Sequence, residues 1–172
     1  MNNLKVDGEK VSDSVNLIVS MLVRYPEIGR LRFDSDTATL HLTFLLTMVP
    51  TKEQFASFKT YLTESLYSFY CLSAYDNPFL CITQDSYDNI TVIHIERDID
   101  TLSKAEIALM IKILAMYFKN HILADKNEAL VDEELRFQEE VIESMLVNIQ
   151  RTHVLNNLIG IRENGRVMVF DK

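Results

Sequence analysis

The sequence predicts an α+β fold in which helices pack on a mainly antiparallel sheet built from three hairpins. Four segments place apolar residues at helical spacing, and between them pairs of short segments alternate apolar with polar residues. Turn-forming residues separate the two members of each pair. The predicted order is αββ-αββ-ααββ. A chain of 172 residues that is 48% hydrophobic is long enough to bury one core, so we expect a single domain over residues 1–172.

The first unit begins with a helix over residues 9–24, which ends before a proline because the residue that precedes a proline leaves the helical region. The apolar stripe of this helix is formed by Val11, Val15, Ile18 and Leu22. Alternating residues then predict a hairpin with one buried face. In the expected register, Arg32 opposes Thr39 on the other face. Arg30 then opposes His41 on that same face.

The second unit begins with a helix that starts after Thr51. Thr51 and Gln54 have the spacing of a capping box, in which two side chains satisfy free backbone N–H groups at a helix start. β-branched residues then predict a second hairpin over residues 79–97. In the simplest register, Cys81 opposes His94 on the face away from the core. That face is only half polar, so we expect part of it to be covered.

The third unit begins with a helix that is apolar on all sides. Ser103 and Glu106 have capping-box spacing. The residues that follow, 107–118, are apolar at every position except Lys112. Such a helix is either central to a core or packed on another subunit.

A last helix and a hairpin complete the chain. The helix is expected to run to about Thr152, with Val131, Leu135, Ile142, Met145, Leu146 and Ile149 facing inward. Asn164-Gly165 predicts a tight turn between strands at residues 158–162 and 166–170, because a type I′ turn needs positive φ at both central residues.

Composition narrows the range of partners. The net charge of −8 and the pI of about 5.0 disfavour nucleic acid, which binds through clustered basic residues. No apolar run is long enough to span a membrane, and no glycine-rich phosphate loop is present. Cys71 and Cys81 lack further ligands at metal-binding spacing, so we expect buried free thiols. These features predict a cytoplasmic chain without a cofactor.

Five residues on the predicted non-core face form a candidate site for an anionic ligand. They are Arg30, Arg32, His41, His94 and Glu96. If the first two hairpins are neighbours in one sheet, a histidine beside an acid and two arginines could hold an anion or perform acid–base chemistry. The alternative is that each is an isolated strand residue that faces solvent or a partner.

A second candidate site consists of Glu140 and Glu143, which lie on one helix face as in Glu-x-x-Glu phosphohydrolase sites that bind divalent metals. The helix that would face them offers only Glu106, so a solvated acidic face is the alternative. We name no catalytic residue and no metal ligand, and whether the chain is an enzyme stays open. The leading hypothesis is a non-enzymatic protein-interaction or regulatory domain, a homodimer or the partner of another protein. Its contact would be the apolar helix near Met110 or the half-apolar sheet face, which is expected to bear Phe79, Ile90, Val92, Val167 and Val169.

Overall fold

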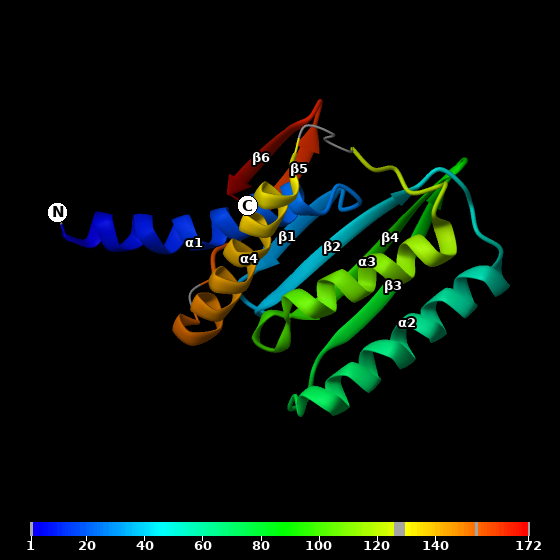
Figure 1. The fold of residues 1–172 in the computed structure, drawn as a ribbon, viewed down its shortest axis with the longest axis horizontal. Coiled ribbons are helices and arrows are strands. Elements are labelled where there is room, and N and C mark those ends of the chain that lie inside the picture. The colour runs from blue at the N-terminus through cyan, green and yellow to red at the C-terminus, as the bar shows by residue number, and fades with distance from the viewer. Residues whose placement is uncertain (1, 126–129, 154, 172) are drawn as a thin grey trace.

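The computed structural model describes residues 2–125, 130–153 and 155–171, with side chains from residue 13 onwards. Within these residues the fold is α+β, with a six-stranded antiparallel sheet and four α-helices, which confirms the predicted class (Figure 1). Along the chain the elements are α1 (Asn2–Arg24), β1 (Arg30–Asp34), β2 (Thr39–Leu46), α2 (Lys52–Ser73), β3 (Leu80–Tyr87), β4 (Ile90–Asp98), a short 3₁₀ helix η1 (Ile99–Thr101), α3 (Lys104–Phe118), α4 (Asp132–Thr152), β5 (Leu158–Glu163) and β6 (Arg166–Asp171).

The strands lie in the order β3-β4-β2-β1-β5-β6. β4 therefore pairs with β2, and β5 pairs with β1, so that the first hairpin lies at the centre of the sheet. The helices lie on one side of this sheet (Figure 1). The core is formed between the two layers by alternate residues of the central strands, among them Leu31, Phe33, Leu42, Phe44 and Ile95, each fully buried.

The register of the first hairpin differs from the expected one by two residues. Arg32 lies opposite His41, and Arg30 lies opposite Thr43, so the expected pairings of these two arginines are wrong. The loop keeps the expected four residues but is displaced by one, to residues 35–38, because Asp34 pairs with Thr39 and Ala38, with φ of 51°, stays out of the ladder. Since strand side chains alternate with a period of two, a slip of two residues leaves each side chain on its predicted face.

The second hairpin also differs from the expected register by two residues. Cys81 lies opposite Glu96, and His94 lies opposite Thr83, so the expected pair of Cys81 with His94 is wrong. The strands continue to a two-residue turn, whose first residue Asp88 has φ of 53°. The shorter turn accounts for the slip, and here too the faces are unchanged.

The two capping boxes have different outcomes. At the start of α2, the side chain of Thr51 accepts from the N–H of Gln54, and the Gln54 side chain accepts from the N–H of Thr51. At the start of α3, Ser103 accepts from the N–H of Glu106 at 3.2 Å. The carboxylate of Glu106 does not complete the box, because it lies in the core against Arg97. The second box is therefore only half formed.

Helix α3 belongs mainly to the core. Its buried residues are Glu106, Ile107, Met110, Ile111, Ile113, Leu114 and Phe118. On α4, Ile142, Leu146 and Ile149 are buried as predicted. Val131 is 58% exposed, so its predicted inward position is wrong. It precedes the first turn of α4, and its N–H lies 3.4 Å from the carboxylate of Glu134.

Candidate functional site

The face of the sheet opposite the helices carries two rows of side chains that cross neighbouring strands. Arg32 of β1, His41 of β2 and Glu96 of β4 lie opposite one another in the first row. Arg30, Thr43 and His94 occupy the same three strands in the second row. We call this surface the open face. The two rows come together because β4 pairs with β2, a pairing that could not be predicted from the sequence.

The first row is a chain of charged contacts. Nη2 of Arg32 lies 3.2 Å from Nδ1 and 3.1 Å from Nε2 of His41. Nε2 of His41 lies 3.3 Å from Oε1 of Glu96, and Nη1 of Arg32 lies 3.7 Å from Oδ2 of Asp34. The side chains of Arg32 and His41 are 23% and 21% exposed. Arg32 thus lies between Asp34 and His41 on a partly buried surface, and His41 in turn contacts Glu96.

The second row is more open to solvent. Oγ1 of Thr43 lies 3.4 Å from Nδ1 of His94, and Nε2 of His94 lies 3.3 Å from Oδ2 of Asp85. Arg30 is exposed, and among the described residues it has no carboxylate within ion-pair distance. Arg30 is therefore a cation of this face that remains available to an anion.

Apolar side chains border the two rows on the side of β5 and β6. Ile159 lies beside Arg32, and Ile161 lies beside Arg30. Phe170 and Met168 continue the same rows on β6. Phe170 is 48% exposed, and the other three are half-buried. The expected position of Val167 and Val169 on this face is wrong, because they alternate with Met168 and pack against the core on the helix side. We expected part of this face to be covered, but within the described residues the helices all lie on the other side (Figure 1).

The five residues predicted as a candidate site, Arg30, Arg32, His41, His94 and Glu96, all lie on the open face. They come from three adjacent strands, β1, β2 and β4. The structure brings them together on a sheet surface, and the cavities described below lie elsewhere in the chain. The arrangement offers one paired and one available guanidinium, two imidazoles and a hydroxyl, which can donate to carboxylate or phosphate oxygens.

A buried ionic cluster lies on the opposite face and was not identified from the sequence. Arg97 of β4 and Glu106 of α3 are both 0% exposed. Nε and Nη2 of Arg97 donate to the two carboxylate oxygens of Glu106 at 2.5 and 2.9 Å. Tyr70 of α2 donates to Glu106 at 2.6 Å, and the guanidinium lies 4.7 Å from the centre of the Tyr70 ring. The cluster thus joins a strand and two helices.

The remaining donors of Arg97 are also used. Nη1 donates to the carbonyl of Phe79 and to the carboxylate of Asp98, and Nη2 donates to Thr101. Desolvation acts to lower the pKa of Arg97, but the hydrogen bond and charge of Glu106 outweigh it and raise the pKa. A guanidinium with this many partners stabilises the packing of α2 and α3 against β4. The signal in the sequence was its place in β4, where Arg97 continues the core-facing alternation of Ile93 and Ile95.

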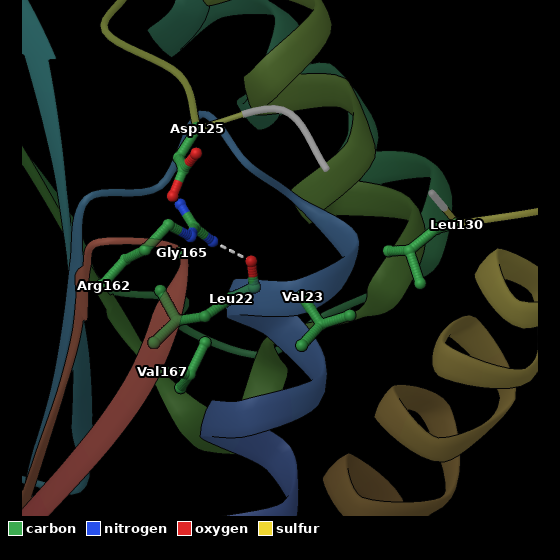
Figure 2. A pocket seen from close by; sticks show the side chains of 7 residues that line it. All are labelled: Leu22, Val23, Asp125, Leu130, Arg162, Gly165 and Val167. Carbon is green, nitrogen blue, oxygen red and sulfur yellow. Dashed lines mark hydrogen bonds between the residues drawn. The ribbon is translucent and has the colours of Figure 1, made fainter. Parts of the chain in front are cut away.

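A cavity of about 330 Å³ lies beside the end of α1 and the last hairpin, and its lining is shown in Figure 2. Its charged groups are Arg162 and Asp125. Arg162 donates to the carbonyl of Leu22, and to those of Pro26 and Ile28 at 2.9 Å each. Desolvation lowers the pKa of Arg162, against the charge of Asp125. Its guanidinium therefore caps the end of α1 and is not directed at a ligand.

The second candidate site is not assembled among the described residues. Glu140 and Glu143 are exposed on α4, and Oε2 of Glu143 lies 3.6 Å from Nζ of Lys104. The described part of the chain contains no group of three histidine, cysteine or acidic side chains placed to hold a metal ion.

The cysteines differ from the prediction in part. Both are free, but Cys71 is exposed on α2, since it lies on the outer side of this helix, and Cys81 is half-buried on β3. Within the residues that the structure describes, none of the helices combines the length and apolar character needed to cross a membrane.

The fold and the open face define a two-layer α+β protein that is covered by helices on one side of its sheet. Comparisons with protein-family models, with curated proteins and with solved structures find no match to this chain.

Proposed function

We propose that this chain is a non-enzymatic protein-interaction domain that acts as a homo-oligomer and contacts a partner through the open face. The observation that carries the proposal is the placement of the helices on one side of the sheet. This leaves the charged rows and their apolar border on a surface of their own. The other contact considered, the apolar helix near Met110, is less suited because most of its apolar residues lie in the core.

The chemistry of the open face suits a protein partner. Protein interfaces combine apolar contact area with charges that fix orientation and exclude wrong partners. Ile161 and Met168 supply apolar area, while Arg30 supplies a charge that has no ion-pair partner among the described residues. Because His41 lies against both Arg32 and Glu96, covering this row with a partner leaves its charges compensated.

The same contacts favour binding over catalysis. A general base needs a free position next to a substrate proton. Both ring nitrogens of His41 lie against Arg32, and its Nε2 also lies 3.3 Å from Glu96. In His94, Nδ1 lies against Thr43 and Nε2 lies 3.3 Å from Asp85. We place this function in the cytoplasm, where cysteines such as the two free thiols stay reduced.

The test compares two variants of the open face with a matched control. The face variants are Arg30→Glu and Ile161→Glu, and the control is Lys112→Glu, an exposed position on α3 on the other side of the molecule. Each protein is used to retain partners from a lysate of the source cells. We expect one partner to be retained by the wild type and by the control and lost with both face variants. A partner retained equally by all four proteins would place the contact elsewhere.

The homo-oligomer has its own measurement. Light scattering across a dilution series is expected to give a molar mass above the 19.9 kDa of one chain. A mass of one chain at every concentration would remove this part of the proposal.

A second candidate function is the binding of a small anion at Arg30, Thr43 and His94. It is favoured because Arg30 and His94 flank the Thr43 hydroxyl on adjacent strands. Titration with inorganic phosphate, followed by NMR of the imidazole signals, is expected to shift those of His94 in the wild type. Arg30→Gln should abolish the shift, whereas unchanged signals in the wild type would rule out this site for phosphate.

A further inference from the structure

We propose that a second copy of this chain docks on the edge of the sheet at β6, where the two β6 strands pair antiparallel about a two-fold axis perpendicular to the sheet. This inference rests on the proposed homo-oligomer and names the surface at which the copies meet. The two open faces would then lie on the same side of one continuous sheet.

The middle of β6, residues 167–170, carries no charged side chain and no proline, the residue types that commonly keep an edge strand from pairing. Within the described residues β6 pairs with β5 alone, and its sequence RVMVFD contains no proline or lysine. The unpaired N–H and C=O groups of such an edge form a template for another strand. The opposite edge, β3, carries Thr83, Asp85 and Ser86, each exposed. The β6 edge is therefore the more apolar of the two.

The geometry of a two-fold pairing restricts its register. Residues directly opposite in an antiparallel pair point to the same face. Because β6 would pair with itself, opposed residues must both be even-numbered or both be odd-numbered. Two registers keep most of the strand paired, one centred on Met168 and the other on Val169.

The register centred on Met168 gives the better side-chain pairs. It places Met168 opposite the partner's Met168 and Val167 opposite the partner's Val169. Arg166 lies opposite the partner's Phe170, which is 48% exposed in the single chain and can pack against a guanidinium. The register centred on Val169 would instead oppose Val167 with the carboxylate of the partner's Asp171. We therefore assign the axis to Met168.

Helix α1 gives an independent reason for a second copy at this edge. α1 packs on β5 and β6, where Ile18 and Leu22 lie against Gly160. In Figure 1 the N-terminal part of α1 extends past the β6 side of the sheet and away from the other elements. At a rise of about 1.5 Å per residue, the backbone of residues 2–12 covers roughly 16 Å. In a copy related by this two-fold axis, the helix layer would lie beside residues 2–12 of the first chain. The α1 helices of the two chains would then be neighbours.

A charge at the axis tests the pairing. In Met168→Glu and in Met168→Lys, like charges lie directly opposite each other, which destabilises a strand pair. We expect light scattering to give the dimer mass for the wild type and 19.9 kDa for each variant alone. An equimolar mixture of the two variants should recover the dimer mass, since opposite charges then meet. The matched control is Met116→Glu, a methionine of α3 that is 60% exposed, and it should stay dimeric.

The outcomes separate this inference from the proposed homo-oligomer. A wild type of one-chain mass overturns both. An oligomeric wild type whose Met168 variants keep the same mass overturns only the docking at β6. Circular dichroism checks that each variant is folded.

A cross-link provides a second measurement if the charged variants fail to fold. In a background of Cys71→Ser and Cys81→Ser, Met168→Cys places two thiols at the axis. Opposed Cα atoms in an antiparallel pair are about 4.5–5.5 Å apart, within the range that a disulfide bridges. We expect oxidation to give a covalent dimer with Met168→Cys and none with Met116→Cys. Absence of the covalent dimer with Met168→Cys would overturn the register.

Discussion

Removing the carboxylate of Glu106 is expected to be among the most destabilising single changes in this chain. In Glu106→Gln the shape of the side chain is kept, but the charge of Arg97 loses its main partner. Both side chains are 0% exposed, so water cannot replace the lost interaction. The amide offers one acceptor oxygen where three donors now converge, namely Nε and Nη2 of Arg97 and the hydroxyl of Tyr70.

The magnitude follows from the cost of breaking a buried ion pair, after which Asp98 is the remaining carboxylate on Arg97 among the described residues. Removing one partner of a buried ion pair costs about 3–5 kcal/mol. A domain of ordinary stability has about 5–15 kcal/mol in total. We therefore expect Glu106→Gln to remove about a fifth or more of the free energy of unfolding. At about 2–4 °C per kcal/mol for a chain of this length, Tm should fall by roughly 6–20 °C.

The assay is urea unfolding followed by circular dichroism, with Glu143→Gln as the matched control. Glu143 also pairs with a cation, Lys104, but its side chain is 65% exposed, so the control should lose less than about 1 kcal/mol. If both variants lost the same small amount, the reasoning about the buried cluster would be refuted.

Three further predictions concern packing and pH. Gly160→Ala should lower the free energy of unfolding in urea by about 1–3 kcal/mol, because the added Cβ would overlap Cγ2 of Ile18. The control Gly29→Ala should be tolerated, since a Cβ there would have no neighbour nearer than 3.6 Å. Equal stabilities of the two variants would contradict the close packing of α1 on β5. Burial and the hydrogen bond to the Glu106 carboxylate raise the pKa of Tyr70 above its usual 10.0. Above about pH 10 the unfolded chain therefore ionises this phenol while the folded chain keeps it neutral. The free energy of unfolding should fall as the pH rises through this range. For Asp98, burial acts to raise the pKa, but hydrogen bonds from Thr101 and Phe79 and the charge of Arg97 hold it below 3.8, so its contribution should be present above about pH 4 and be lost on further acidification. Unfolding measured against pH checks both signs, and Tyr70→Phe should remove the alkaline loss.

The pattern of apolar residues was enough to predict the α+β class with an antiparallel sheet. Alternation in β4 and helical spacing in α1 report which side chains face the core, and that information is local. The capping box at Thr51 is also local, and it formed as predicted. The face occupied by His41 and His94 was predicted for the same reason, because alternation fixes the face of a strand residue even when the register is wrong by two.

Strand register and neighbours were beyond the reach of such patterns. The slip in the first two hairpins depended on whether residues such as Ala38 enter the ladder or stay in the turn, and both choices leave the same face buried. The order of the strands depends on which apolar faces pack together, so the meeting of His41 with Glu96 could be stated from the sequence only as a condition.

The sequence by itself determined the α+β class, the buried faces of the strands in the first two hairpins and the five charged and polar residues predicted on the open face. Only the tertiary structure decided that β4 lies beside β2, which brings the predicted site residues together. It also decided that Glu106 completes a buried pair with Arg97 and not the second capping box. The physical reason is that burial of a charge depends on partners distant in sequence, whereas periodicity and capping depend on neighbours within a few residues.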